Sequence, residues 1–192
     1  QKCVIIGENA CKNPLPFTTM AGNLQLGFFQ FSVAIGFDSG YNTKSDNISI
    51  GPESLCGFNK TFKFNSTQFI IDNHFANVER NTVIGRRAMQ WTNQCSNNTV
   101  IGYDNFRDIK SCNDTIALGS YIYGHKNNNG LYDQSFYSKT SSYNIFIGNK
   151  CAMHPNGNIS ESMYIGNNAG KESQGNNNIY IGKNTGSLST GN

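Results

Sequence analysis

The chain has 192 residues, of which 14% are charged, and its formal net charge is only +3. Lysines and arginines are scattered singly apart from Arg86-Arg87, so we expect no nucleic-acid partner, which would require a basic patch. The sequence has no apolar run of about 18 residues, so we expect no membrane insertion. It begins at Gln1 without a signal-type segment, which predicts a processed form or a fragment of a longer protein.

One phrase recurs along the chain: an apolar residue, any residue, Ile or Leu, and then Gly. In chain order it occupies residues 4–7, 24–27, 33–36, 48–51, 82–85, 99–102, 116–119, 145–148, 163–166 and 179–182. Most intervals are 15 to 18 residues, and we interpret the interval of 34 as two turns, with residues 69–72 (FIID) as a degenerate copy. A recurrence of this kind predicts stacked, structurally equivalent units.

Each copy has the pattern of a short strand, in which residues two apart share a face. The position before Gly is always Ile or Leu and the position two earlier is mostly aliphatic, so we expect both columns to face the core. The residue between them varies from Ser49 to Tyr164, which predicts an outward position. The Gly ends the strand where the backbone must turn or approach a neighbour closely.

Asn precedes the Gly by four residues in six copies, and such Asn side chains both cap turns and form hydrogen-bonded ladders. These residues are Asn23, Asn47, Asn81, Asn98, Asn144 and Asn178. The whole pattern predicts an all-β fold, a parallel β-solenoid of ten to eleven rungs of about 17 residues. We expect one repeat domain over residues 1–192, with inserted loops at 52–69 and 120–143.

The expected outward column becomes aromatic in the last three copies, at Phe146, Tyr164 and Tyr180. An exposed aromatic stripe usually marks an interface, so these are our candidates for contacts between chains of an oligomer. The alternative is stacking of one ring on the next along an ordinary exposed face.

Segment 120–143 is the candidate receptor-binding loop, because it mixes aromatic residues with Asn, Ser and Gly as antibody paratopes do. A surface of this kind also suits sugars. The candidates are Tyr121, Tyr123, His125, Tyr132, Phe136, Tyr137 and Tyr143. The alternative is that these rings pack against the solenoid or a neighbouring chain, which we favour for the Phe-rich loop 52–69.

Cys95 and Cys112 each lie ten residues after a repeat Gly, so neighbouring rungs would stack them. They either form a disulfide or remain two buried thiols. The six cysteines include no C-x2-C pair and the three histidines have no metal-ligand spacing, so we expect no metal or other cofactor. No motif for nucleophilic or phosphate chemistry occurs, and we expect no enzymatic activity.

The stretches NNTVIGYDNF (97–106), NNIYIGKNTG (177–186) and FSVAIGFDSG (31–40) resemble the head repeat of trimeric autotransporter adhesins, N-S-V-A-I-G-x-x-A/S. They are also similar to the NNTAIGYNAL repeats in tail fibres of phages and large DNA viruses. The resemblance extends from Cys3 to Gly186 and implies a left-handed parallel β-roll, three chains side by side, and attachment to a surface. The longer turn and the six cysteines favour the viral variant, since bacterial passengers of this family usually avoid cysteine.

We therefore expect an attachment module of a virion fibre or spike, a homotrimeric rod at the virion surface or otherwise extracellular. Its expected partners are other copies of itself, a host cell-surface glycan or protein, and neighbouring fibre or capsid components. Two alternatives are a structural solenoid subunit that assembles into a filament or surface layer, and a bacterial surface adhesin head. The family's heptad stalk and C-terminal self-cleaving chaperone segment are absent from this sequence.

Overall fold

The computed structural model describes residues 3–10, 17–18, 24–25, 32–40, 46–55, 64–65, 68–69, 77–90, 92, 94–107, 109, 111–123, 140–153 and 158–187. Over these residues the regular structure is all β, as the repeat predicts. None of them belongs to a helix long and apolar enough to cross a membrane.

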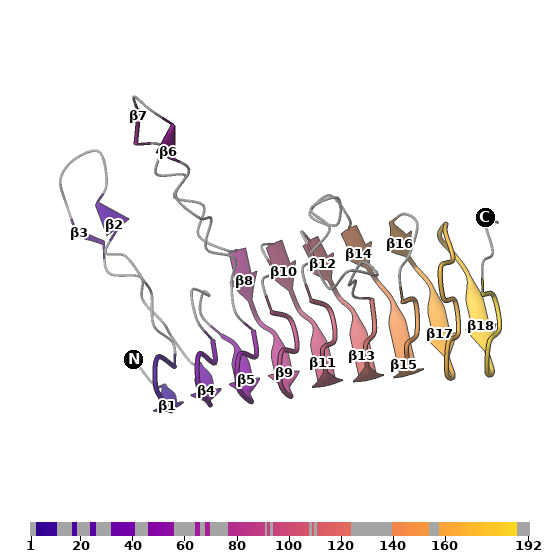
Figure 1. Ribbon diagram of the computed structural model, residues 1–192, viewed down its shortest axis with the longest axis horizontal. Coiled ribbons are helices and arrows are strands. Elements are labelled where there is room, and N and C mark those ends of the chain that lie inside the picture. Colours follow the sequence, from indigo (N-terminus) through magenta and orange to yellow (C-terminus); the bar gives the residue numbers. More distant parts are fainter. Residues whose placement is uncertain are drawn as a thin grey trace.

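The larger of two long sheets has nine parallel strands, stacked in the order of the chain (Figure 1). They are β1 (Val4–Ile6), β4 (Val33–Ile35), β5 (Ile48–Ile50), β9 (Thr82–Ile84), β11 (Thr99–Tyr103), β13 (Ile116–Ser120), β15 (Ile145–Asn149), β17 (Met163–Ile165) and β18 (Ile179–Ile181). Neighbouring strands pair in register, so that Val100 lies between Val83 and Ala117. Each position of the repeat therefore forms a column along the rod.

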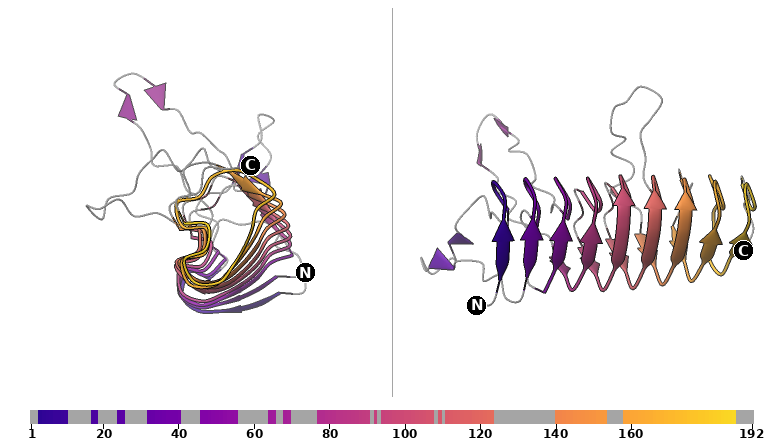
Figure 2. Two further views of the ribbon diagram at one scale, coloured as in Figure 1. Left: turned by 90° about the vertical axis from the view of Figure 1, so that its right-hand side faces the viewer. Right: turned by 90° about the horizontal axis from the view of Figure 1, so that it is seen from below.

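A second parallel sheet has five strands in the order β16-β14-β12-β10-β8. These are β8 (Asn77–Glu79), β10 (Gln94–Ser96), β12 (Ser111–Asn113), β14 (Thr140–Ser142) and β16 (Ile159–Ser160). Each precedes a strand of the larger sheet, and Figure 2 shows the successive turns superposed when the rod is viewed along its length. Two parallel sheets of short strands wound in this way are a solenoid arrangement.

Two details of the predicted repeat were wrong. The copy at residues 24–27 does not join the large sheet, because β3 (Leu24–Gln25) pairs antiparallel with β2 (Phe17–Thr18). The interval of 34 residues is not two turns of that sheet, because β5 pairs directly with β9. Of the expected FIID copy, Phe69 lies in β7 (Gln68–Phe69), antiparallel to β6 (Phe64–Asn65), and residues 70–72 lie outside the described part.

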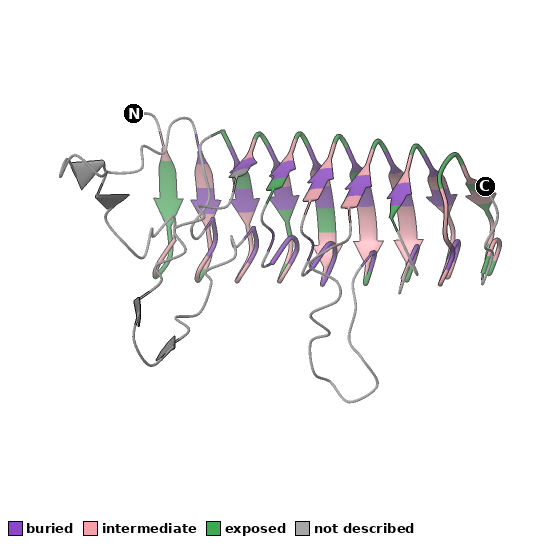
Figure 3. Ribbon diagram, turned by 90° about the horizontal axis from the view of Figure 1, so that it is seen from above, coloured by how far each residue is buried: buried purple, intermediate pink, exposed green. Residues whose placement is uncertain are grey.

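The orientation of the strands is the reverse of the prediction. The variable middle position is the one that faces the interior, and it is buried from β4 to β17. Its residues there are Ala34, Ser49, Val83, Val100, Ala117, Phe146 and Tyr164. The two aliphatic columns that flank it face outward, where many of their side chains are exposed (Figure 3). Counting apolar residues misassigned the face because the most uniformly apolar columns do not belong to the chain's own core.

The interior is filled jointly by the middle position of each strand and by the turn residue four positions after Gly. Where the strand supplies Ser49, Val83, Val100 or Ala117, the turn supplies Leu55, Met89, Phe106 or Tyr123. Where the strand supplies Phe146, Tyr164 or Tyr180, the turn supplies Ala152, Gly170 or Gly186. From β5 to β18 a larger residue on one side thus meets a smaller one on the other, which keeps the interior close-packed, whereas in the β4 rung both residues, Ala34 and Gly40, are small.

The aromatic members form a continuous ladder inside the rod. Ring centroids are 5.4 Å apart for Phe106–Tyr123, 6.0 Å for Tyr123–Phe146, 5.3 Å for Phe146–Tyr164 and 4.9 Å for Tyr164–Tyr180. These separations lie in the favourable range for aromatic pairs. The ladder passes from the turn column to the strand column between Tyr123 and Phe146.

The repeat Gly is required by close backbone approach. Gly102 has φ +129°, and a Cβ placed there would lie 2.7 Å from the carbonyl carbon of Gly119 in the next rung. Two and four residues later the backbone is left-handed again, at Asp104 (φ 51°) and Phe106 (φ 52°). These positions fold the chain tightly enough to return it for the next strand.

The predicted Asn ladder is confirmed for Asn47, Asn81 and Asn98, whereas Asn144 and Asn178 hydrogen-bond to Ser162 between them. Asn98 Nδ2 donates to Asn81 Oδ1 at 2.9 Å, and Asn81 Nδ2 donates to Asn47 Oδ1 at 3.1 Å. Asn98 Nδ2 also donates to the Cys112 carbonyl at 2.9 Å, and its Oδ1 accepts the Thr115 backbone N–H at 3.0 Å. These buried amides connect the two sheets and satisfy backbone groups at the corner between them.

Candidate functional site

The outer face of the nine-stranded sheet is the most distinctive surface of the molecule. We define it as the first and third residues of the Val/Ile-x-Ile phrase in each strand, eighteen positions, of which sixteen are apolar and two are Thr. Exposed fractions reach 57% at Ile6 and 69% at Ile179, while Ile84 and Ile101 in the middle of the rod are 36% and 39% exposed. None of the eighteen is charged.

The size of this face points to a binding role. At about 4.8 Å per strand, nine strands extend the two columns over roughly 40 Å. With side chains about 10 Å wide in total, the patch covers on the order of 400 Å², which is typical of the largest and usually functional patch on a monomer. Its two-column regularity is a consequence of the in-register pairing.

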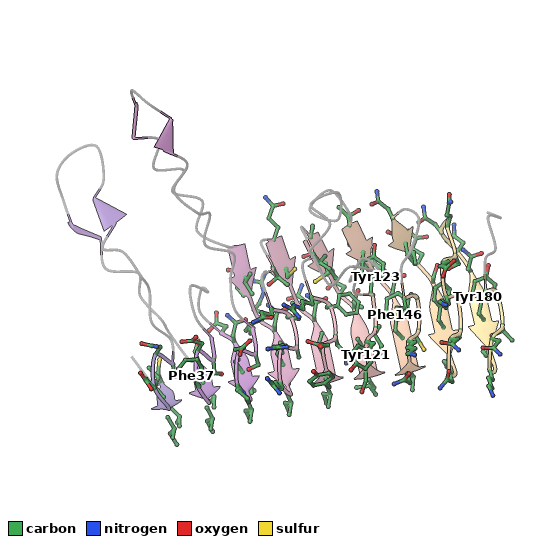
Figure 4. The ribbon with its side chains drawn as sticks, in the orientation of Figure 1. Phe37, Tyr121, Tyr123, Phe146 and Tyr180 are labelled. Carbon is green, nitrogen blue, oxygen red and sulfur yellow. The ribbon has the colours of Figure 1, made fainter. Side chains whose placement is uncertain are left out.

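Exposed aromatic residues lie beside this face, just after the strands end. Phe37 and Tyr121 are 47% and 41% exposed, and Figure 4 places them near the ends of β4 and β13. The rings of Tyr121 and Tyr103 meet edge to face with centroids 5.4 Å apart. Partial burial and the neighbouring Tyr103 raise the pKa of Tyr121, so it remains a neutral hydrogen-bonding phenol at physiological pH.

The structure separates the predicted receptor-binding residues into three groups. Tyr121 and Tyr143 are exposed, Tyr143 to 63%. Tyr123 is fully buried, so its assignment to a receptor surface was wrong: its hydroxyl donates to the Thr140 carbonyl at 2.9 Å, and burial raises its pKa. The others, His125, Tyr132, Phe136 and Tyr137, lie outside the described residues.

The expected aromatic interface at Phe146, Tyr164 and Tyr180 was also wrong. Phe146 and Tyr164 are fully buried inside their own chain, and Tyr180 is partly buried against that core. Figure 4 shows Phe146 beside Tyr123 in the interior between the two sheets. The stacking of one ring on the next therefore occurs inside the rod, not on an exposed face.

A small ionic cluster connects the turns after β5 and β9. Arg87 Nε donates to Glu53 Oε2 at 3.0 Å, and Gln90 Nε2 donates to the same oxygen at 2.6 Å. Burial opposes ionisation of Glu53, but the hydrogen bonds from Arg87 and Gln90 outweigh it and lower the pKa of the carboxyl. A second pair, Arg107 and Asp104, lies 3.6 Å apart with both side chains nearly buried.

The stacking of Cys95 and Cys112 is confirmed. They are register partners in β10 and β12, both are fully buried, and their sulfur atoms lie 2.8 Å apart as unbridged thiols. Burial raises the pKa of Cys112 well above its ordinary value, and the adjacent Cys95 raises it further. Within the described part of the chain, no three His, Cys, Asp or Glu residues gather in a way that could hold a metal ion.

Sequence reasoning missed the outer face as a surface, although it had found both of its columns. The signal that distinguishes it is uniformity, since a core column varies in size to match its partner while these columns do not. Comparisons with known proteins return no matching family model, no matching curated protein and no matching solved structure.

Proposed function

We propose that the chain is a rod-forming module of a virion fibre or spike, that three copies associate through their outer faces, and that the assembly attaches to a host surface. The observation that supports this best is the outer face, two uncharged aliphatic columns along the full length of the nine-stranded sheet. The proposal includes the left-handed winding that the resemblance implies. It assigns no catalytic role to the chain.

A second copy of the chain is the natural partner for this face. Its columns repeat at the spacing of adjacent strands. A partner with the same repeat can place one of its apolar side chains beside each apolar side chain of this face along roughly 40 Å. Burying a side chain of this type is worth about 1.5–3 kcal/mol, so many half-exposed residues in line favour association strongly.

Three copies suit the two-column geometry better than two. Around a threefold axis each column can pack beside a column of one neighbour, so that both columns of every chain are covered. A patch on the order of 400 Å² is about half of what one partner contributes to a standard interface. The flanking rings of Phe37 and Tyr103 are placed to extend it.

The attachment role is supported by exposed tyrosines fixed to a rigid support. Tyr121 and Tyr143 flank the insertion that follows β13, and the residues at its two ends, Tyr123 and Thr140, are joined by a hydrogen bond in the rod. Binding residues are often held in this way by a rigid scaffold. Tyrosine rings offer a flat apolar face and a hydroxyl, which suits a sugar, so a host glycan is the proposed receptor.

The mass in solution tests the assembly. Three chains of 21.2 kDa give about 64 kDa (3 × 21.2), and light scattering on a sizing column should show this species. The double variant Ile84→Asp/Ile101→Asp introduces charge into the two outward columns and should yield monomers. The control Gln94→Asp places one such charge at an exposed site of the smaller sheet and should leave the mass unchanged. A wild-type monomer would contradict the trimer.

Binding to host cells or to immobilised glycans tests the attachment. Tyr121→Ala and Tyr143→Ala should each weaken binding at least several-fold while leaving the oligomeric mass unchanged. Lys150→Ala, at an exposed position after β15, is the matched control. Binding that survives the double tyrosine variant would exclude these residues as the contact.

One observation favours the filament alternative. Ile5 occupies the middle column in β1, yet it is 49% exposed, whereas the same column is buried from β4 to β17. The interior is thus open at this edge strand, and a second rod stacked end to end would cover it. Open-ended polymers in the mass measurement, instead of a single species, would support this alternative.

A further inference from the structure

The thiols of Cys95 and Cys112 form a preset pair across the seam between two turns. β10 and β12 are parallel neighbours, and the two cysteines are direct partners in their register. Strands in a sheet lie about 4.8 Å apart, which is within the range of Cα separations that a disulfide spans. The two sulfur atoms already face each other, 2.8 Å apart.

The column that contains the pair does not require cysteine for packing. The column that contains them continues as Val78 on one side and Ser141 and Ile159 on the other, so it accepts several small or aliphatic residues. Cys151, the other buried cysteine among the described residues, is different, because its thiol donates to the Gly166 carbonyl at 2.8 Å. Cys95 and Cys112 instead have each other.

We propose that Cys95 and Cys112 are a disulfide modification site that reacts only while the chain folds, so that the finished rod preserves the redox state of the compartment in which it folded. An oxidising compartment gives a stapled rod, and a reducing compartment gives a rod with two thiols. Each form then persists, because the closed rod shields the pair.

The reaction is a two-step thiol–disulfide exchange with a small disulfide of the glutathione class as oxidant. The thiolate of one cysteine attacks a sulfur of the oxidant, forms a mixed disulfide and releases one thiol. The second cysteine then attacks the protein sulfur of the mixed disulfide, forms the protein disulfide and releases the second thiol. Overall, two protein thiols lose two protons and two electrons, and one small disulfide is reduced to two thiols.

The thiols react during folding because the oxidant can reach them only before the rod is complete. Both side chains are fully buried in the folded rod, so an oxidant cannot reach either sulfur along the line of attack. Burial also raises the pKa of Cys112, which suppresses the reactive thiolate. In the unfolded chain both thiols are accessible and only 17 residues apart, a short loop to close.

Peptide mapping can identify the bridge unambiguously. Cleavage after Lys and Arg places Cys95 in peptide 88–107 and Cys112 in peptide 111–126, and neither contains another cysteine. The full chain is refolded from denaturant with oxidised and reduced glutathione, or with reduced glutathione alone, then alkylated under denaturing conditions, digested and weighed. The expected result is a linked pair of these peptides, two hydrogens lighter than their sum, only in the oxidised refold.

The shielding is tested on finished rods. Reduced, folded protein incubated with the same oxidant should form the linked peptides at least tenfold more slowly than the refolding chain does. Stapled rods should in turn resist reduced glutathione until denatured. Equal rates for folded and refolding chains would overturn the timing, and failure to find the linked pair in the oxidised refold would overturn the site.

Variants separate the bridge from general folding effects. Cys112→Ser should fold, since Ser141 occupies the next place in the column, and should lose the linked pair; Cys112→Val, which mimics Val78, is a second choice. Cys151→Ser should keep the pair. In the oxidised refold, wild type should unfold in denaturant at least tenfold more slowly than Cys112→Ser. When both proteins are reduced in denaturant and refolded with reduced glutathione alone, they should unfold at similar rates. If Cys151→Ser keeps the linked pair but oxidised wild type and Cys112→Ser unfold at the same rate, the disulfide forms without slowing unfolding. That result would overturn the stabilising effect of the disulfide.

Discussion

The rungs built on β5, β9, β11 and β13 and those built on β15, β17 and β18 enclose the same interior in opposite ways. In the first group the turn supplies the large core residue, for example Tyr123, and the strand supplies a small one, Ala117. In the second group the strand supplies Tyr164 and the turn supplies Gly170. The backbone repeat and the in-register pairing continue through both groups.

The difference shows that, from β5 to β18, one of the two positions supplies a large core residue and that either the strand or the turn can supply it. The exchange occurs between β13 and β15, at the insertion between Tyr123 and Thr140. Where the large core residue changes from the turn position to the strand position, Tyr123 and Phe146 must pack against each other. Their rings are stacked with an interplanar angle of 16°.

The largest effect is expected from emptying the turn side of a turn-filled rung. Tyr123→Gly removes a buried ring at a left-handed position that Gly accepts, and should cost about 3–5 kcal/mol. Ala117→Phe alone should overpack the same rung and cost about 1–3 kcal/mol. Both are measured as shifts of the denaturant midpoint.

The double variant Ala117→Phe/Tyr123→Gly converts this rung to the strand-filled type. Because the new ring occupies the space that the old ring left, the double variant should lose less unfolding free energy than the two single variants lose together. The difference should be at least about 1 kcal/mol. Simple additivity would show that the two arrangements are not interchangeable.

A reverse test applies to a strand-filled rung. A Cβ at residue 170 would meet the Tyr164 ring, so Gly170→Ala should destabilise the rod by about 2–3 kcal/mol, although the equivalent turn position elsewhere holds Leu55 or Met89. In a Tyr164→Val background the same substitution should cost only about 1 kcal/mol, the cost of a left-handed Ala. Equal costs in both backgrounds would remove the ring as the cause.

The corner ladder also differs between the two groups. Asn98 donates to Asn81 and Asn81 donates to Asn47, whereas beyond Thr115 the hydrogen bonds run from Asn178 to Ser162 and from Ser162 to Asn144. Asn98→Ala leaves buried backbone groups unpaired and should cost about 2 kcal/mol by thermal or chemical unfolding. Asn97→Gly, at the adjacent exposed position, is the control and should change stability by less than about 0.5 kcal/mol.

The smallest effect concerns the ionic cluster of the turn-filled group. Because the pKa of Glu53 is lowered in the folded rod, its contribution is present above the unfolded pKa of about 4.3 and is lost as pH falls through the lower folded value. Glu53→Gln should therefore cost under about 1 kcal/mol at pH 7 and nothing at strongly acidic pH. A loss that does not depend on pH would attribute the effect to packing.

Much of the fold was predictable from the sequence because the repeat is carried by backbone requirements. Gly102 occupies a position of close backbone approach that recurs along the large sheet, and Asn98 occupies a buried corner position that several turns also fill with Asn. The orientation of the strands was not predictable from apolarity alone, since one face is the chain's interior and the other is outside it. The direct pairing of β5 with β9 was hidden because an insertion of about one turn's length resembles a missing copy.

For the candidate site, the stacking of Cys95 on Cys112 followed from spacing, since register converts equal offsets into contact. Tyr121 and Tyr143 were identified by composition, but the same criterion included Tyr123, whose burial depends on the small Ala117 opposite it. Phe146, Tyr164 and Tyr180 were expected on the outside because composition alone did not show that the turn beside each of them holds a small residue. Composition does not record which volume a neighbouring turn leaves free.

The direction of the backbone hydrogen bonds between neighbouring strands has a mechanical consequence. In both long sheets these bonds join one turn to the next and so run along the rod, as the stacked strands in Figure 1 show. Tension applied at the two ends would load one boundary at a time, and the rod would lose single turns in succession. Each lost turn of 17 residues would release roughly 50 Å of extended chain, so the rod would lengthen in steps and absorb a pull before it broke. The boundary between β10 and β12, when stapled, would be the point at which this unwinding stops.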